Sequence, residues 1–277
     1  GETTPARMVQ RGSAPPRTSM SVCLGAVRIT CPPSSFSTHS RMRRERPGSS
    51  SAKTSSRRMI GSWPECSRMV SASTMRSATA DGITIINFGM GSPNAATVMD
   101  CLSAIAPKAA LFLGKCGGLK KKNNIGDLIL PIAAIRGEGT SNDYFPPEVP
   151  ALPAFALQKA ISTTIRDFGH DYWTGTVYTT NRRIWEWDED FKVYLRKIRA
   201  QAIDMETATI FSTAFHNKIP TGALLLVSDQ PMVPEGVKTE ISDMSVTRKF
   251  VEIHLKIGIE SLKQLINHGV TVKHLWY

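Results

Sequence analysis

Short runs of apolar, β-branched residues alternate with helical patterns along most of the chain. Five such runs predict buried strands, at residues 83–88, 109–113, 128–135, 173–179 and 224–227. Apolar residues at helical spacing predict helices at about 153–168, 188–199, 205–216 and 245–267. This alternation favours an α/β fold, with a mostly parallel mixed sheet flanked by helices.

A well-defined helix start follows the first predicted strand. Ser92 is a suitable N-cap, and Pro93 suits the first helical position, where a missing N–H costs nothing. Apolar residues then recur at helical spacing until Pro107, which we expect to stop the helix. Two glycines, Gly89 and Gly91, precede this start, so backbone N–H groups can approach an anion or a sugar there.

The first 80 residues differ in composition from the rest of the chain. They contain 17 Ser, 12 Arg and 7 Pro, and no helical or strand periodicity lasts beyond a few positions. Such a composition cannot bury enough apolar surface to offset the entropy lost on ordering. We therefore expect an unstructured basic segment at 1–74 and a folded domain at 75–277.

The formal net charge of +11 comes almost entirely from this first segment. Residues 1–80 hold 13 basic and 3 acidic side chains, a net +10, whereas residues 81–277 hold 21 and 20, a net +1. A fold that is basic throughout and binds nucleic acid is thereby disfavoured. Three interpretations of the segment stay open: a disordered tail, a nucleic-acid-binding arm, or an out-of-frame translation joined to the folded part near Met75.

Several classes of protein are disfavoured by what the sequence lacks. No stretch approaches the roughly 20 apolar residues that span a bilayer, and the N-terminus has no continuous apolar region typical of a secretory signal. Five cysteines at irregular spacing argue against a disulfide framework and favour the cytoplasm. The six histidines show no ligand spacing with cysteines or carboxylates, so we expect neither a metal nor another cofactor.

Ligands of open α/β sheets bind beyond the carboxyl ends of the strands, which points to polar segments at those ends. Gly114–Gly118 follows the second predicted strand and places Lys115 among backbone amides that can hold a phosphate. Asp204 and Glu206 stand where a strand gives way to a helix, and Asp229 directly follows the last apolar strand. Each has a plainer explanation as well, because turn glycines, solvated lysines and capping carboxylates are common at such places.

Taken together, these segments resemble the purine nucleoside phosphorylase and nucleosidase superfamily. The resemblance rests on Gly-Met-Gly-Ser-Pro, Gly-Lys-Cys-Gly-Gly, Asp-Met-Glu and Val-Ser-Asp, with Glu206 and Asp229 23 positions apart. Within the superfamily the chain is similar to the AMP nucleosidases from about Met75 to Tyr277. The segments that carry this similarity are residues 136–150, 178–183, 227–231 and 234–239.

The resemblance implies hydrolysis of the N-glycosidic bond of AMP to adenine and ribose 5-phosphate. Asp229 would be the general acid at the purine, Glu206 would hold the ribose hydroxyls, and Met205 would pack on the sugar. Further implied contacts to the sugar, base or 5′-phosphate are Gly91, Lys115, Arg136, Thr140, Ser141, Asn142, Tyr178, Arg183, Trp185 and Ser228. Trp187 is another aromatic candidate for the base.

The resemblance leaves alternatives for the reaction. Nucleoside phosphorylases carry an arginine that binds inorganic phosphate two residues before the second glycine-rich segment, and Phe112 stands there instead. This favours water over phosphate as the nucleophile. Three interpretations compete with AMP hydrolysis: a nucleoside phosphorylase, another nucleosidase, and an inactive nucleotide-binding protein with a basic arm that binds nucleic acid. The resemblance also implies a homo-oligomer, a hexamer as in relatives, with AMP as its small-molecule partner and with neither membrane nor nucleic acid.

Overall fold

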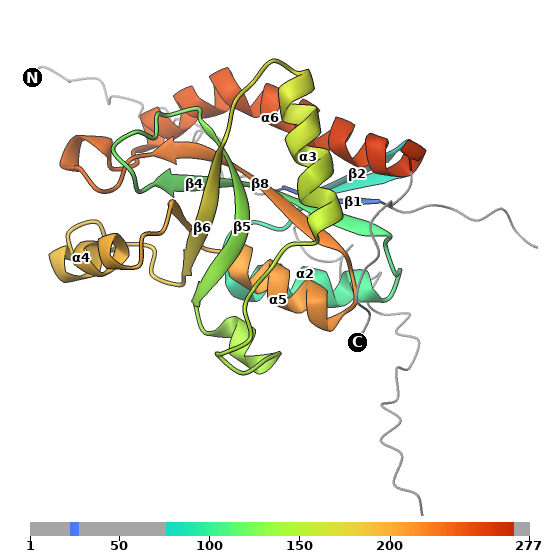
Figure 1. Ribbon diagram of the computed structural model, residues 1–277, viewed down its shortest axis with the longest axis horizontal. Helices are drawn as coiled ribbons and strands as arrows, with labels where there is room; N and C mark the ends of the chain where they lie inside the picture. Colours follow the sequence, from blue (N-terminus) through green and yellow to red (C-terminus); the bar gives the residue numbers. More distant parts are fainter. Residues whose placement is uncertain (1–22, 28–75, 269–277) are drawn as a thin grey trace, which may run out of the picture.

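The computed structural model describes residues 23–27 and 76–268 (Figure 1). Its strands form one eight-stranded sheet: β1 (Cys23–Val27), β2 (Arg76–Ala80), β3 (Ile83–Asn87), β4 (Ala109–Gly118), β5 (Leu128–Gly137), β6 (Trp173–Thr180), β7 (Ala202–Asp204) and β8 (Thr221–Asp229). The α-helices are α2 (Ser92–Ser103), α3 (Phe155–Asp167), α4 (Glu189–Lys197), α5 (Thr207–His216) and α6 (Glu240–His268). Two 3-10 helices, η1 (Thr140–Asp143) and η2 (Pro234–Gly236), complete the described elements.

The strand order is β2-β3-β1-β4-β7-β6-β5-β8, and β4 also pairs with β8. The pairs β4–β8, β5–β6 and β6–β7 are parallel, whereas β1, β2 and β3 join through antiparallel pairs. The predicted α/β class is confirmed. The pairs β4–β7 and β5–β8, which join the parallel group β5, β6 and β7 to the parallel pair β4 and β8, are antiparallel. Even so, residues at the carboxyl ends of β4, β6, β7 and β8 line one pocket.

Helices cover both faces of the sheet (Figure 1). On one face α2 packs with α5, and their apolar side chains join the strands in a core that includes Met99, Phe112 and Phe211. On the other face α3 packs with α6 around Ile161, Ile165 and Ile257. The amphipathic patterns read from the sequence therefore identify the buried face of each helix.

The longest of these helices, α6, lies along the sheet and carries His254 into the core. His254 Nε2 lies 2.9 Å from the carbonyl oxygen of Leu224, and burial lowers the pKa of this imidazole to about 4. His254 is thus a neutral packing residue of the helix. No helix in the described part of the chain is long and apolar enough to cross a bilayer.

Four strands, β1, β2, β4 and β7, differ from the sequence-based expectation. Cys23–Val27, within the segment expected to be unstructured, forms β1 and pairs with both β3 and β4, while residues 1–22 and 28–75 lie outside the described part. β2 was not predicted, and β7, indicated only as the strand that gives way to a helix at Asp204 and Glu206, has three residues. Gly114–Gly118, expected to be a loop, instead continues β4. At Gly117 a Cβ atom would lie 2.8 Å from the ring of Pro231, so glycine serves a close approach here rather than a turn.

Candidate active site

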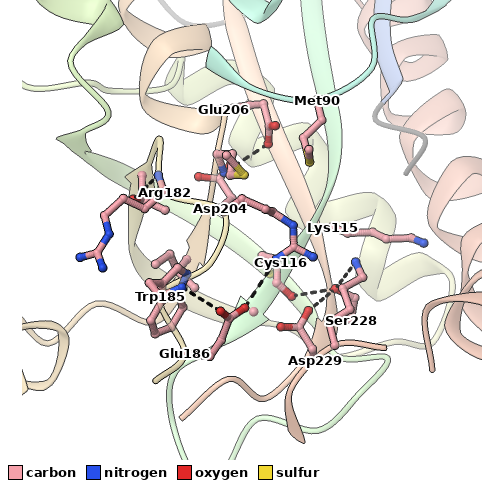
Figure 2. A pocket seen from close by; sticks show the side chains of 16 residues that line it. Met90, Lys115, Cys116, Arg182, Trp185, Glu186, Asp204, Glu206, Ser228 and Asp229 are labelled. Carbon is pink, nitrogen blue, oxygen red and sulfur yellow. Dashed lines mark hydrogen bonds and ion pairs between the residues drawn. The ribbon is translucent and has the colours of Figure 1, made fainter. Parts of the chain in front are cut away.

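A pocket of about 620 Å³ opens at the edge where the carboxyl ends of β4, β6, β7 and β8 meet (Figure 2). Seven of the residues singled out in the sequence line it: Lys115, Arg183, Trp185, Met205, Glu206, Ser228 and Asp229. These residues come from segments more than 100 positions apart along the chain. The pairing of β4 with both β7 and β8 brings them together.

Asp229 ends β8 and is only 9% exposed. The hydroxyl of Ser228 donates a hydrogen bond to Asp229 Oδ1 at 2.6 Å. Burial raises the pKa of Asp229 above its usual value, although this hydrogen bond and the nearby Lys238 charge oppose the shift. A carboxyl group with a raised pKa at the wall of a pocket is suited to hold and donate a proton.

Glu206 stands just before α5 and is 3% exposed. Its Oε1 accepts a hydrogen bond from the Gly91 N–H at 2.6 Å, and its Oε2 accepts one from the Met205 N–H at 3.2 Å. Burial and the neighbouring Asp204 raise the pKa of Glu206 to about 8. Glu206 is therefore largely neutral near pH 7 when no ligand is bound.

The first glycine-rich loop holds Glu206 through Gly91 and contributes Met90 to the pocket wall. Gly91 has a φ of +99°, which favours glycine, and this conformation turns its N–H toward Glu206. The Ser92 hydroxyl donates to the carbonyl oxygen of Met205 at 2.6 Å. Gly91 does not line the pocket, and its N–H instead contacts Glu206, which does.

Asp204 has a different task from Glu206, although the two are only two positions apart. Its carboxylate accepts hydrogen bonds from the Thr207 N–H at 2.8 Å and from the Thr179 hydroxyl at 2.7 Å. These bonds cap the first turn of α5 and join it to β6. The capping role that the sequence allowed for both carboxylates thus holds for Asp204, whereas Glu206 makes no such cap.

Two buried lysines share one carboxylate beside the pocket. Lys115 Nζ lies 2.8 Å and Lys238 Nζ 2.9 Å from Asp243 Oδ1. Burial alone would raise the pKa of Asp243, but the hydrogen bonds from both lysines outweigh it and the pKa is lowered. Burial also lowers the pKa of Lys238, which donates to the Ser228 hydroxyl at 3.2 Å. This cluster gives one side of the pocket a net positive charge.

The wall between β6 and α4 adds an aromatic ring and further charges. Trp185 is 5% exposed and packs edge-on against Phe191. Glu186 follows it, nearly buried at 6% exposure, and pairs with Arg183 at 3.5 Å. Arg182 also lines the pocket and binds Asp188 at 2.9 Å. Trp187, by contrast, is 74% exposed and is absent from the pocket wall.

Cys116, the thiol of the second glycine-rich segment, lines the pocket but is not a nucleophile there. Burial raises the pKa of its thiol well above the ordinary range, and the nearby Asp204 and Asp229 add to the shift. The thiolate that a nucleophilic role requires is therefore disfavoured.

Arg136 lies outside the pocket, although the sequence placed it at the 5′-phosphate. Each of its five N–H donors is used within its own loop. The acceptors are Ser141 Oγ (2.8 Å), Asn142 Oδ1 (3.0 Å) and the carbonyl oxygens of Phe145 (2.7 Å), Pro146 and Val149 (2.8 Å). Thr140, Ser141 and Asn142 also lie away from the pocket wall, in and beside η1. In the described chain these residues organise a loop, and the phosphate contact predicted for them is not part of this pocket.

Tyr178 is also absent from the pocket wall. Its ring is 8% exposed and packs edge-on against Phe191 and Tyr194 under α4. The plainer explanation, core packing, describes Tyr178, and Trp185 is the aromatic side chain that reaches the pocket.

Three charged residues of the site were not identified from the sequence. Lys238 and Asp243 come after the last predicted strand, and Glu186 stands between two tryptophans. Lysines and acids near a helix start are commonly solvated, so their residue types alone carried no signal. The Trp-Glu-Trp context of Glu186 was a usable hint, because an acid in an apolar neighbourhood needs a partner.

Comparison with known proteins is consistent with this fold. Residues 65–267 match the profile of the Phosphorylase superfamily, and the chain belongs to that superfamily. It is 33% identical to AMP nucleosidase of Escherichia coli K12 over 201 residues, which are 69% of this chain but 41% of that protein. The chain thus spans less than half the length of that curated relative.

Solved structures agree with the assignment. The structure of AMP nucleosidase from Bacteroides thetaiotaomicron VPI-5482 is similar with a TM-score of 0.63 and 56% sequence identity, over 72% of this chain and 78% of that one. Uridine phosphorylase from Vibrio fischeri ES114 shares the fold at 21% identity and a TM-score of 0.60, over 69% of this chain and 78% of that one. The resemblance to AMP nucleosidases read from the sequence is confirmed.

Proposed function

We propose that this protein hydrolyses the N-glycosidic bond of AMP to adenine and ribose 5-phosphate. The observation that carries the proposal is that Glu206 and Asp229 line one pocket and both have raised pKa values. The similarity to proteins described as AMP nucleosidases supports the choice of substrate. The bond breaks when the purine leaves with the bonding electrons and water adds to the sugar carbon.

Asp229 acts as the general acid. Its protonated carboxyl donates to N7 of adenine, which makes the purine a better leaving group. A positioned general acid typically contributes 10²–10⁴-fold, or roughly 3–5 kcal/mol of the barrier. The hydrogen bond from Ser228 fixes Oδ1, so Oδ2 is the oxygen available to the base.

Glu206 holds the ribose. Hydroxyl groups of the bound sugar donate to its carboxylate, and hydrogen bonds to the charged form favour ionisation. The positive charge that develops on the sugar as the purine leaves favours the same ionised form. Glu206 therefore carries its full charge when that charge lowers the barrier. Met205 lies beside it in the pocket wall and packs on the sugar.

The 5′-phosphate has cationic partners in the pocket itself. Lys115, Lys238 and Arg183 line it, and a guanidinium can form a two-pronged contact with a phosphate. Lys115 and Lys238 meet at a single oxygen of Asp243, so their ammonium groups are close enough together to bind one phosphate group. These residues replace Arg136 and the Thr140–Asn142 segment as the proposed phosphate contacts.

Water is the proposed nucleophile. Phe112 occupies the position at which phosphorylases carry an arginine, and its fully buried ring packs 6.2 Å from that of Phe88. This part of the chain supplies apolar core instead of a charge for inorganic phosphate. We further propose a cytoplasmic homo-oligomer that needs no cofactor, as the sequence resemblance implies.

Product analysis tests the proposal. The purified full chain is incubated with AMP, with and without inorganic phosphate, and the sugar product is identified. Ribose 5-phosphate at equal rates in both conditions is expected. A phosphate-dependent rate that yields a doubly phosphorylated sugar would instead show a phosphorylase. No adenine release from AMP under either condition would exclude both reactions.

A further inference from the structure

Glu186 is a buried carboxylate that the proposed reaction leaves without a task. It lies in the segment between β6 and α4, is 6% exposed and lines the pocket. The Trp185 N–H donates to its Oε2 at 2.9 Å, and Arg183 Nη1 lies 3.5 Å from its Oε1. A carboxylate can accept about four hydrogen bonds. Glu186 therefore keeps acceptor capacity toward the pocket.

Such a group is costly to bury unless it is fully paired. Removal of a carboxylate from water costs several kcal/mol, and the long contact with half-exposed Arg183 compensates only part of this. The cost is recovered when a bound molecule donates a hydrogen bond to the remaining acceptor sites. The pocket side of Glu186 thus fits a ligand group that carries N–H or O–H.

Asp229 is the neighbour that identifies this ligand group. Figure 2 shows the carboxyl groups of Glu186 and Asp229 turned toward each other across one end of the pocket. The charge of Glu186 is among the causes that raise the pKa of Asp229. One carboxyl of the pair thus offers a proton, while the other, beside Arg183, offers acceptor oxygens. Asp229 as donor and Glu186 as acceptor are together complementary to a ligand that carries a hydrogen-bond acceptor next to a hydrogen-bond donor.

The outer edge of adenine has that pattern. N7 is an acceptor and the adjacent exocyclic amino group is a donor, whereas guanine and hypoxanthine present two acceptors, N7 and O6. We propose that Glu186 is a specificity-determining residue that accepts a hydrogen bond from the 6-amino group and disfavours 6-oxopurines. This inference rests on the proposed function, in which Asp229 meets N7 of the same base.

The test compares bases at constant sugar and phosphate. For wild type, kcat/KM is measured with AMP, IMP and GMP, and AMP is expected to be preferred. In Glu186→Gln the ratio of kcat/KM for AMP over IMP should fall about 10- to 100-fold, because an amide can turn either its oxygen or its NH2 to the base. Glu186→Asp, which keeps the charge, should retain a preference for AMP. Glu189→Gln, a change of an exposed acid paired with Lys192, is the matched control and should leave the ratio unchanged.

A structural role would give a different result. If Glu186 only anchors Trp185 and Arg183, Glu186→Gln should lower the melting temperature or slow all three nucleotides equally, and an AMP/IMP ratio unchanged within twofold would overturn the inference. Calorimetric binding of free adenine and hypoxanthine separates this outcome from failure of the proposed function. In one outcome the wild-type protein cleaves no nucleotide and yet binds adenine more tightly than hypoxanthine. If Glu186→Gln then removes this binding preference, the proposed reaction is wrong and the inference about Glu186 stands.

Discussion

Two clusters of polar side chains were equal candidates by residue type, and their hydrogen bonding distinguishes them. In the loop around η1, all five donors of Arg136 are satisfied by acceptors within the next thirteen positions. In the pocket, Asp229 Oδ2 has no hydrogen-bond partner among the described residues, and Glu186 keeps further acceptor positions on its two paired oxygens. The carboxyls of Asp229 and Glu206 also have raised pKa values. Arg136 therefore has no N–H donor left for a ligand. Unused hydrogen-bonding capacity at the end of a parallel strand is thus more informative than charge alone.

Replacement of the proposed acid is expected to have the largest effect. Asp229→Asn keeps the shape of the side chain but has no acidic proton to donate. Turnover of AMP should fall at least about 10²-fold, equivalent to roughly 3 kcal/mol or more of barrier. Steady-state kinetics measure the loss, and an unchanged circular dichroism spectrum shows that the fold is intact. Near-normal turnover would remove Asp229 from its proposed role.

The raised pKa of Glu206 predicts that the free energy of unfolding depends on pH. It is raised from 4.5 to about 8, so between these values the folded chain binds more protons than the unfolded chain. The free energy of unfolding should therefore fall as pH rises through this window, by on the order of 3 kcal/mol for this group. Glu206→Gln cannot ionise, so its loss of stability from pH 5 to 8 should be smaller than that of wild type.

Chemical denaturation at several pH values measures this difference, and kinetics should show lowered turnover in the same variant. Equal slopes of stability against pH for wild type and Glu206→Gln would contradict the neutral state of Glu206. Undiminished activity would show that the ribose is held elsewhere.

The Arg136 loop should respond in the opposite way to the pocket. Arg136→Lys keeps the charge but cannot make five fixed contacts, so the free energy of unfolding should fall by about 2 kcal/mol. The kcat/KM for AMP should stay within about threefold of wild type. Thermal melting and kinetics on one preparation provide both values. A rise in KM for AMP without a change for adenosine would instead return Arg136 to the phosphate site.

Much of the architecture could be predicted because buried apolar positions recur in the sequence with the period of a helix or a strand. The strand at 83–87 and helices α2 and α6 fall within a few positions of their expected bounds, since their apolar faces repeat along the chain. β4 was predicted too short, because its glycines indicate a turn in sequence but permit close contact with Pro231 in three dimensions. Periodicity cannot distinguish these two uses of glycine.

The site was only partly predictable for a related reason. Glu206 and Asp229 follow strand patterns, so their place at the sheet edge could be inferred. Three of the five acceptors that bind the Arg136 guanidinium are backbone carbonyl oxygens. Every residue has such an oxygen, so the sequence does not show which ones face Arg136. Lys238 reaches the pocket through the fold of the segment between β8 and α6, and Asp243 in the first turn of α6 pairs with it. No spacing in the sequence specifies that path.

The smallest effect is expected at Lys115, because its charge is already shared with Asp243 and Thr247 at 2.8 and 2.7 Å. A phosphate must compete with that carboxylate, so the contact contributes only about 1.4 kcal/mol, or tenfold in affinity. Lys115→Met should raise KM for AMP about tenfold and leave cleavage of adenosine, which lacks the phosphate, unchanged. Lys121→Met, at an exposed lysine outside the pocket, is the matched control. Equal losses for AMP and adenosine would show that Lys115 does not bind the 5′-phosphate. Lys115 would then act on the sugar or, like Arg136, stabilise the fold.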